Sequence, residues 1–318
     1  MRALVTGANG FIGSHLCELL KEKGEYVRGM VRRTSDLTWI NGLDIELAYG
    51  DLRDRDSLER AVVGMDWVFH TAATVRPRDP ADYERVNYEG TKVFANMCAD
   101  AGVGRFVFFS SAAAAGPALG ADRPKTETDK VCPVSQYGKG KLKAEQAILE
   151  IKDRLHSVIL RLSAVYGPRD RDNLILLRNL KHGIRTVFGG TFSVVYVKDA
   201  VRAALLAAER DVVSGSVFFV ADGCFYTYDD IARVAEELLD RRTVRVRIPN
   251  WVLKTAGCVS ERFSRGSIFN RDKAKELSQG CWVCSSNKAK KELGFEPEYR
   301  LERGLEETVR WYQERKWL

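Results

Sequence analysis

The sequence lacks the long apolar runs of a membrane protein. No segment approaches the ~18 uninterrupted apolar residues of a membrane span, and the opening residues MRALVTGANG do not have the pattern of a secretory signal peptide. Internal repeats and low-complexity segments are also missing, which argues against solenoid and fibrous architectures. We therefore expect a globular, cytoplasmic protein whose contact with membranes is at most peripheral.

Cysteines and histidines are too few and too scattered for a disulfide framework or a metal site. The cysteines are odd in number, at positions 17, 98, 132, 224, 258, 281 and 284, unlike the paired spacings of disulfide-rich domains. Cys281 and Cys284 form one C-x-x-C, but no second such pair or pair of histidines accompanies them, as a four-ligand zinc site requires. We predict no metal.

A block of one charge sign is missing as well. The 50 basic and 43 acidic residues give a net charge of +7 that is spread over the chain. The densest basic stretches, RRTVRVRIP at 241–249 and NKAKKELG at 287–294, are typical of solvated strand or helix faces rather than of a nucleic-acid-binding module. We expect an anionic small molecule as partner and no nucleic acid.

The first half of the sequence alternates short β-rich apolar runs with segments of helical period. The runs RALVTG, YVRGMVR, DIELAYGD, DWVFHTAA, RFVFFSS and HSVILRLS predict strands that are buried on both faces. Helical patterns lie between them, over 11–23, 56–63, about 84–102 and 135–152. This alternation predicts an α/β fold with a Rossmann-type, doubly wound parallel sheet.

After Tyr166 the pattern becomes mixed. Short strands alternate with helical segments near 172–182, 198–209, 227–239 and 301–316. We predict a dinucleotide-binding Rossmann domain over 1–165, to which strands from about 194–222 return. A smaller, interleaved substrate-binding lobe is expected over 166–318. Because no Pro-, Gly- or Ser-rich linker separates the parts, we expect one body with a cleft between them.

The stretch ALVTGANGFIGSHLCELL places Gly7, Gly10 and Gly13 between the first strand and the first helix. Glycines there permit a tight turn, the approach of a diphosphate to backbone N–H groups, and close helix packing. We predict a dinucleotide site that includes these glycines and the residues Asn9, Phe11 and Ile12. Further cofactor contacts are expected from Thr71, Ala72, Ala73, Asn87 and Ser110.

The end of the second strand bears on the choice of dinucleotide. It reads Val31, Arg32, Arg33, with no Asp or Glu to hold the ribose hydroxyls of NAD, whereas arginine suits the 2′-phosphate of NADP. We favour NADP, with Arg32 as its main contact. NAD stays open, because these arginines can also be exposed loop charges. Asp51 and Leu52 are expected to bracket the adenine.

The stretch SQYGKGKLKAEQ sets Tyr137 four residues before Lys141, so the two share one face of a helix. An ammonium near a phenol favours the phenolate and lowers the phenol's pKa toward the working range of an acid or base. Taken alone, the same spacing would also fit two exposed side chains that have no catalytic role.

These motifs together resemble the extended short-chain dehydrogenases/reductases, in the NAD-dependent epimerase/dehydratase group. The resemblance rests on TGANGFIG, GDLRD, VFHTAA, NYEGT, FFSSAAAAG, the Tyr137/Lys141 pair and VYGP, in family order over nearly the whole chain. It implies that Ser111, with Ser110 as the second choice, hydrogen-bonds the reacting oxygen. It also implies that Tyr137 is the general acid/base, that Lys141 holds the nicotinamide ribose, and that the protein is a homodimer.

Departures from the family pattern bear on the substrate. Gly140 stands where Ser is frequent, Leu162 and Ala164 stand where many relatives carry Pro and Asn, and no Arg occurs between Gly190 and Lys198. Relatives that bind nucleotide sugars often hold the substrate diphosphate with that Asn and with an Arg in the stretch that corresponds to 190–198. The C-terminal third instead resembles the dihydroflavonol-reductase and 3β-hydroxysteroid-dehydrogenase-like branch, whose substrates tend to have apolar skeletons.

Three functions follow for testing. The first is NAD(P)-dependent hydride transfer to or from a secondary alcohol or ketone on an apolar skeleton. The alternative is a nucleotide-sugar epimerase, dehydratase or decarboxylase, and a third is a non-catalytic cofactor sensor. Trp251, Val252, Leu253 and Ala256 fall at near-helical spacing, as expected for an apolar pocket, a membrane-surface helix or an ordinary amphipathic helix on the core.

Overall fold

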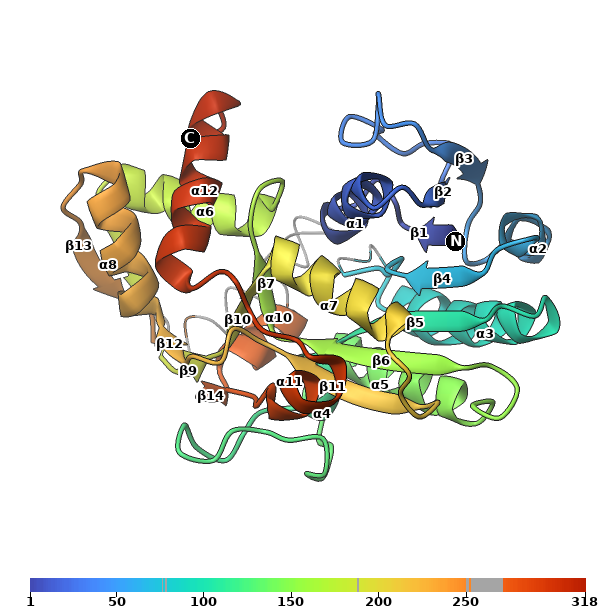
Figure 1. The fold of residues 1–318 in the computed structure, drawn as a ribbon. Helices are drawn as coiled ribbons and strands as arrows, with labels where there is room; N and C mark the ends of the chain where they lie inside the picture. The colour runs from blue at the N-terminus through green and yellow to red at the C-terminus, as the bar shows by residue number, and fades with distance from the viewer. Residues whose placement is uncertain (76, 78, 188, 250–251, 253–270) are drawn as a thin grey trace.

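A seven-stranded sheet forms the centre of the computed structural model, which describes residues 1–75, 77, 79–187, 189–249, 252 and 271–318 (Figure 1). Its order is β11-β6-β5-β4-β1-β2-β3, and every neighbouring pair is parallel. The doubly wound parallel sheet expected from the sequence is therefore confirmed. The strands are β1 (Arg2–Thr6), β2 (Tyr26–Val31), β3 (Glu46–Tyr49), β4 (Trp67–His70), β5 (Arg105–Ser111), β6 (Ser157–Leu162) and β11 (Ser216–Val220).

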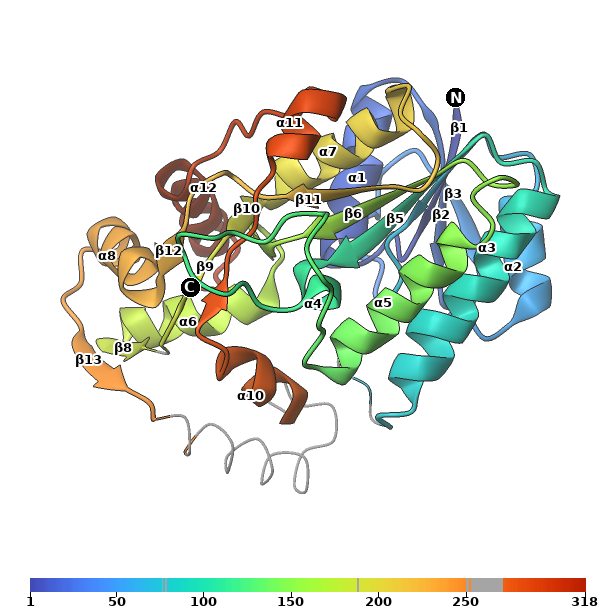
Figure 2. The same cartoon turned by 90° about the horizontal axis from the view of Figure 1, so that it is seen from below.

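Helices cover both faces of this sheet (Figure 2). One layer contains α1 (Phe11–Glu22) and α7 (Val197–Glu209), and the other contains α2 (Arg55–Val62), α3 (Thr91–Asp100) and α5 (Gln136–Leu149). Along β1, Ala3 and Val5 belong to the apolar cluster on one side of the sheet and Leu4 to the cluster on the other. Burial on both faces explains why these strands read as nearly continuous apolar runs.

The direction of winding reverses between β1 and β4. From β1 the chain proceeds outward to β2 and β3 on one side, and then returns to place β4 on the other side of β1. In doubly wound sheets such a reversal opens a crevice at the carboxyl ends of the strands, where ligands bind. Gly7 directly follows β1 and Thr71 directly follows β4, so both loops meet at this crevice.

The segment expected as one helix over 84–102 contains two kinds of helix. It begins as a π-helix, η1 (Tyr83–Gly90), and continues as α3. The wider π-turn is a local variation that a 3.6-residue pattern does not reveal. The short helix α4 (Ala112–Ala115) follows β5 and contacts α5, β5 and β6.

The remaining elements form smaller sheets and a second group of helices. The strands are β7 (Ala164–Tyr166), β8 (Ile184–Val187), β9 (Thr191–Phe192), β10 (Val194–Tyr196), β12 (Tyr226–Thr227), β13 (Val244–Arg247) and β14 (Cys281–Trp282). The helices are α6 (Arg171–Lys181), α8 (Tyr228–Leu239), α10 (Arg271–Leu277), α11 (Asn287–Leu293) and α12 (Leu301–Glu314). β11 returns to the edge of the large sheet, whereas β10 pairs with β7 outside it. Of the predicted apolar helix, Trp251, Leu253 and Ala256 lie outside the described residues.

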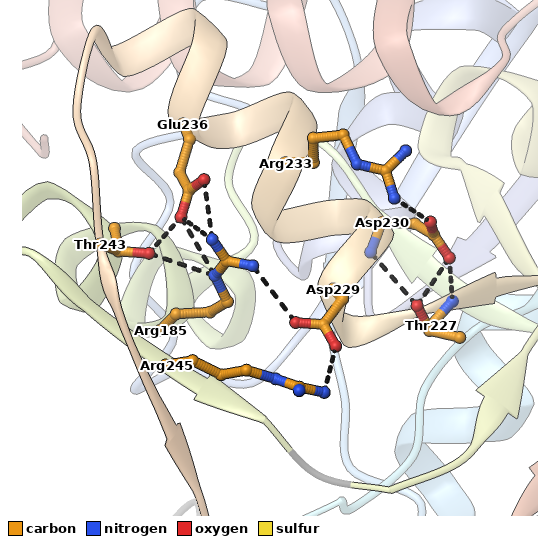
Figure 3. Close-up of polar contacts among 8 residues, drawn as sticks. All are labelled: Arg185, Thr227, Asp229, Asp230, Arg233, Glu236, Thr243 and Arg245. Carbon is orange, nitrogen blue, oxygen red and sulfur yellow. Dashed lines mark hydrogen bonds and ion pairs between the residues drawn. The ribbon is translucent and has the colours of Figure 1, made fainter.

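Ion pairs hold α8 against the β8–β13 pair (Figure 3). Arg185 on β8 donates to Glu236 at 2.7 Å and lies 3.3 Å from Asp229, which also accepts from Arg245 on β13 at 2.6 Å. Thr227 caps α8 through a reciprocal pair of contacts with Asp230. All four residues of β13 are exposed, so the ion pair of Arg245 with Asp229 lies at the surface, as expected for a solvated basic stretch.

Candidate active site

The glycine loop between β1 and α1 is too tight for side chains. Gly7 has a φ of +69°, and its N–H donates to the carbonyl of Met30 at 3.0 Å. A Cβ at Gly13 would lie 2.2 Å from the Gly7 carbonyl oxygen, so the first turn of α1 packs directly on the loop. Gly10 caps α1 without a side-chain hydrogen bond, which leaves first-turn N–H groups to bind an anion. The loop therefore fits a diphosphate.

The loop after β4 packs against the glycine loop. Thr71 donates its hydroxyl to the Thr6 carbonyl at 2.6 Å, and the Ala72 N–H donates to the Thr6 hydroxyl at 3.1 Å. A Cβ at Gly7 would lie 3.0 Å from the Ala72 Cα. Ala73 follows in the same loop, so the structure brings together the two segments in which cofactor contacts were predicted.

The other predicted loop residues are placed by contacts of their own. Asn9 donates its side-chain amide to the Asp36 carbonyl at 3.1 Å. Phe11 packs edge-on against His15 at 6.0 Å between ring centroids, and Ile12, in the first turn of α1, packs against the core. These residues hold the loop and the start of α1 in place.

A cavity of about 300 Å³ lies at the ends of β2 and β3. It is lined by Arg32, Arg33, Thr34, Tyr49, Gly50, Asp51, Arg53 and Asp54. Arg53 pairs with both oxygens of Asp51, at 2.9 and 3.0 Å, and mainly through this contact lowers the pKa of that carboxyl. Leu52 is buried against η1. Arg53 is paired with Asp51, and Arg32 and Arg33 are the further cations that make this end of the crevice suitable for an anion.

Tyr137 and Lys141 lie on α5, whose first turn is capped by Ser135 through the N–H of Gly138 at 2.9 Å. The Lys141 ammonium donates to the Phe109 carbonyl at 2.7 Å and lies over the Phe108 ring at 4.7 Å, and the residue is only 2% exposed. The Lys141 ammonium is thus directed at the end of β5 and not at the surface, which argues against two freely exposed side chains.

Small residues let α5 approach its neighbours. A Cβ at Gly138 would lie 2.3 Å from the Ala113 carbonyl oxygen, and one at Gly140 would lie 3.0 Å from the Tyr83 carbonyl oxygen. The departure at Gly140 therefore has a structural reason, because η1 packs closely on this side of the helix. The Tyr83 ring also contacts Tyr137, with 6.2 Å between centroids.

Ser111, rather than Ser110, faces Tyr137. The Ser111 side chain is near enough to the Tyr137 phenol to lower its pKa, and its hydroxyl accepts from the Ala113 N–H at 3.2 Å. Ser110 instead donates to Glu145, which forms a buried ion pair with Arg161 at 2.7 Å. Adjacent residues of a strand point to opposite sides, so only one of the two serines can reach the phenol.

Burial is the largest cause of the pKa shifts of Tyr137 and Lys141. It raises the pKa of the Tyr137 phenol, and the negative charge of Glu276 raises it further, against the lowering effect of the nearby Ser111 hydroxyl. Burial also lowers the pKa of Lys141 to about 7, although Glu145 opposes this. The lowered phenol pKa expected from the sequence is thus not found, because desolvation of the phenolate outweighs the favourable contacts.

Asn87 and His70 are held by structural hydrogen bonds. Asn87 accepts from the Thr74 N–H at 2.7 Å and donates to the Thr74 carbonyl at 2.8 Å, so its amide orders the loop after β4. His70 lies between the hydroxyls of Thr6 and Thr91 at 2.8 and 3.0 Å. Complete burial lowers the pKa of His70 to about 3, and the ring is neutral.

Sequence reasoning missed the contacts that support α5. Glu145 lies four residues after Lys141, so helical spacing alone could have placed it on the same face. Its partner Arg161 lies on β6, and Asp272 of α10 accepts from the N–H of Tyr137 at 2.9 Å. No local pattern indicates these partners.

Among the described residues, no group of three or more His, Cys, Asp or Glu side chains is arranged to hold a metal. Within the same part of the chain, none of the helices is long and apolar enough to cross a bilayer. Cys284 is buried, and burial raises the pKa of its thiol to about 12. Cys258 lies outside the described residues.

Comparison with known proteins gives matches along the whole chain. Residues 3–221 match the NAD dependent epimerase/dehydratase family. Sterol demethylase protein B of Methylococcus capsulatus is 32% identical over 99% of both chains. Ceramide reductase of Caulobacter vibrioides is 31% identical, over 99% of this chain and 95% of its own. The structure of UDP-glucose 4-epimerase from Thermotoga maritima, solved with UDP-glucose, superposes with a TM-score of 0.82 at 27% identity, covering 99% of this chain and 100% of that one.

Proposed function

The chain belongs to the NAD-dependent epimerase/dehydratase family, and from that premise we propose that it interconverts a ketone and a secondary alcohol on an apolar skeleton. The observation that carries this proposal is the gathering of Ser111, Tyr137 and buried Lys141 at the end of β5, where Lys141 donates to the Phe109 carbonyl and Ser111 acts on the phenol. Two of the relatives it resembles are named for sterol demethylation and ceramide reduction, and the substrates in those names are lipids.

Each side chain has a distinct task in this mechanism. When bound, the dinucleotide supplies or accepts the hydride. The loop from Gly7 to Gly13 binds its diphosphate through backbone N–H groups, and Lys141 holds the nicotinamide ribose. Ser111 hydrogen-bonds the substrate oxygen, and Tyr137 gives that oxygen a proton in reduction or removes one in oxidation. The raised pKa of Tyr137 keeps the phenol protonated, which favours its role as proton donor in reduction over that of a base in oxidation.

Nucleotide-sugar epimerisation is the second candidate, and the similarity to an epimerase structure with UDP-glucose favours it. Against it stand Leu162 and Ala164, which replace Pro and Asn of many relatives. Relatives that bind nucleotide sugars often use an Arg here for the substrate diphosphate, and no Arg occurs between Gly190 and Lys198.

Cofactor choice, assembly and location are further parts of the proposal. We favour NADP over NAD because Arg32, Arg33 and Arg53 line one cavity. We propose a homodimer formed through η1, α3 and α5, and a cytoplasmic location. A Rossmann domain over 1–165 with a substrate lobe over 166–318 remains our proposed division of the chain.

The test is consumption of NADPH with a panel of apolar ketones, followed by absorbance. We expect turnover, and we expect Tyr137→Phe to lower kcat by about 10²–10⁴-fold, the usual contribution of a general acid. Tyr88→Phe, which removes a phenol of η1 outside the site, is the control and should leave kcat unchanged. Epimerisation of a UDP-sugar without net consumption of dinucleotide would refute the reductase, and turnover that depends on Tyr137 would refute a non-catalytic sensor.

A further inference from the structure

Helix α10 of the second group of helices lies near the start of α5, which carries Tyr137 (Figure 2), and hydrogen bonds join the two. Asp272 is 9% exposed and uses both carboxylate oxygens in this contact. One accepts from the Gln136 N–H at 2.8 Å and the other from the Tyr137 N–H at 2.9 Å. The two elements are about 135 residues apart in the chain.

The contact supplies acceptors for backbone N–H groups in the first turn of α5. The first N–H groups of a helix have no acceptor within the helix. In α5 the Gly138 N–H is bound by the Ser135 hydroxyl, and the Lys139 N–H begins the regular series by donating to the Ser135 carbonyl at 3.0 Å. The N–H groups of Gln136 and Tyr137 are the ones bound by Asp272. A carboxylate is also the favourable charge at this end of the helix dipole.

Glu276 makes a second contact at the same place. It lies four residues after Asp272 and therefore on the same face of α10. Its carboxylate accepts from the Ser135 hydroxyl at 2.7 Å, and Lys273 lies 3.4 Å from it. Its side chain is 16% exposed. Ser135 thus links the carboxylate of Glu276 to the first turn of α5.

We propose that Asp272 and Glu276 are positioning residues for Tyr137, through which α10 holds the first turn of α5 at the crevice. The proposal rests on the function assigned above to Tyr137. Asp272 acts on the backbone of Tyr137 and Glu276 acts through Ser135 and its charge. The groups that face the phenol are Ser111 from β5, Tyr83 from η1 and Glu276 from α10, with Lys141 one turn along α5.

The pKa of the phenol supports a role for Glu276. After burial, its charge is the largest cause that raises the pKa of Tyr137. A carboxylate near the phenol opposes the ionisation of the phenol. Tyr137 therefore stays protonated until the substrate oxygen takes the proton.

The first experiment measures amide hydrogen exchange by NMR and needs no substrate. In Asp272→Ala we expect the Gln136 and Tyr137 amides to exchange at least about tenfold faster than in the wild type, because each loses its acceptor. Asp272→Asn keeps one acceptor oxygen, so the exchange rates of these two amides should lie between those of the wild type and of Asp272→Ala. Lys275→Ala, on the exposed side of α10, is the control and should change neither amide. Unchanged exchange in Asp272→Ala would overturn the proposal.

The second experiment uses the ketone assay. Asp272→Asn should lower kcat more than it raises the KM for NADPH, because Asp272 binds the first turn of α5, whereas the glycine loop and Lys141, one turn further along, hold the dinucleotide. Glu276→Gln should move the Tyr137-dependent limb of the pH profile to lower pH, and Glu292→Gln, an exposed residue of α11, should not. An unmoved limb in Glu276→Gln would overturn the role of its charge. Absence of any turnover in the wild type would contradict the proposed function instead, and the exchange result would still decide whether Asp272 caps α5.

Discussion

Lys141 illustrates how a single buried charge makes stability depend on pH. Burial lowers its pKa from 10.5 to about 7, so the unfolded chain binds more protons than the folded one between these values. The free energy of unfolding should therefore rise with pH across this window, by at most about 1.4 kcal/mol per pH unit. Above and below this window, Lys141 should not make the free energy of unfolding depend on pH.

Lys141→Met removes this titration. We expect the variant to be more stable than the wild type at and below pH 7, and the difference to shrink as the pH approaches 10.5. Urea denaturation of both proteins, without dinucleotide, at several pH values measures this. A difference that is constant with pH would show that Lys141 keeps its ordinary pKa in the folded protein.

Arg32 is the residue on which the preference for NADP depends. If it binds the 2′-phosphate, Arg32→Ala should raise the KM for NADPH at least about tenfold, since a hydrogen bond to a charged group is worth ~1.5–3 kcal/mol. The KM for NADH should not change. Arg60→Ala, an exposed arginine of α2 outside the cavity, serves as the control. Equal effects on both dinucleotides would contradict the preference.

Among the elements, α8 is secured at its start by a side chain and not only by packing. Thr227 accepts from the Asp230 N–H at 3.2 Å, and Asp230 in return accepts from the Thr227 N–H at 2.9 Å. Losing such a cap costs about 1 kcal/mol. We expect Thr227→Ala to lower the free energy of unfolding by this amount in chemical denaturation. Thr227→Ser keeps the hydroxyl and should restore most of it; a loss as large in the serine variant would exclude capping as the cause.

At the scale of the whole molecule, the proposed homodimer places η1, α3 and α5 at the interface. Val93 of α3 is 38% exposed, and a buried glutamate without a partner would be strongly unfavourable there. Light scattering should give the dimer mass for the wild type and the monomer mass for Val93→Glu. Val213→Glu, at a residue that is 81% exposed and belongs to neither helix layer, should remain a dimer. A monomeric wild type would refute the assembly.

Local sequence patterns were sufficient for the fold and for part of the site. Strands buried on both faces read as apolar runs, and the helices between them follow a 3.6-residue period, so the parallel sheet could be predicted. The glycine spacing at Gly7 to Gly13 and the four-residue spacing of Tyr137 and Lys141 are local as well. For the same reason, the bounds of most predicted elements agree with the structure to within a few residues.

Tertiary structure decided the relations between segments that are distant in the chain. It selected Ser111 over Ser110, because neighbouring strand residues point to opposite sides and only one side faces α5. It reversed the expected shift of the Tyr137 pKa, because the four-residue spacing of Tyr137 and Lys141 does not indicate how deeply the phenol is buried. It also supplied Asp272, which reaches the N-terminus of α5 from a separate helix. Sequence periodicity reports which face of an element is buried, whereas partners across a fold are set by how the elements pack.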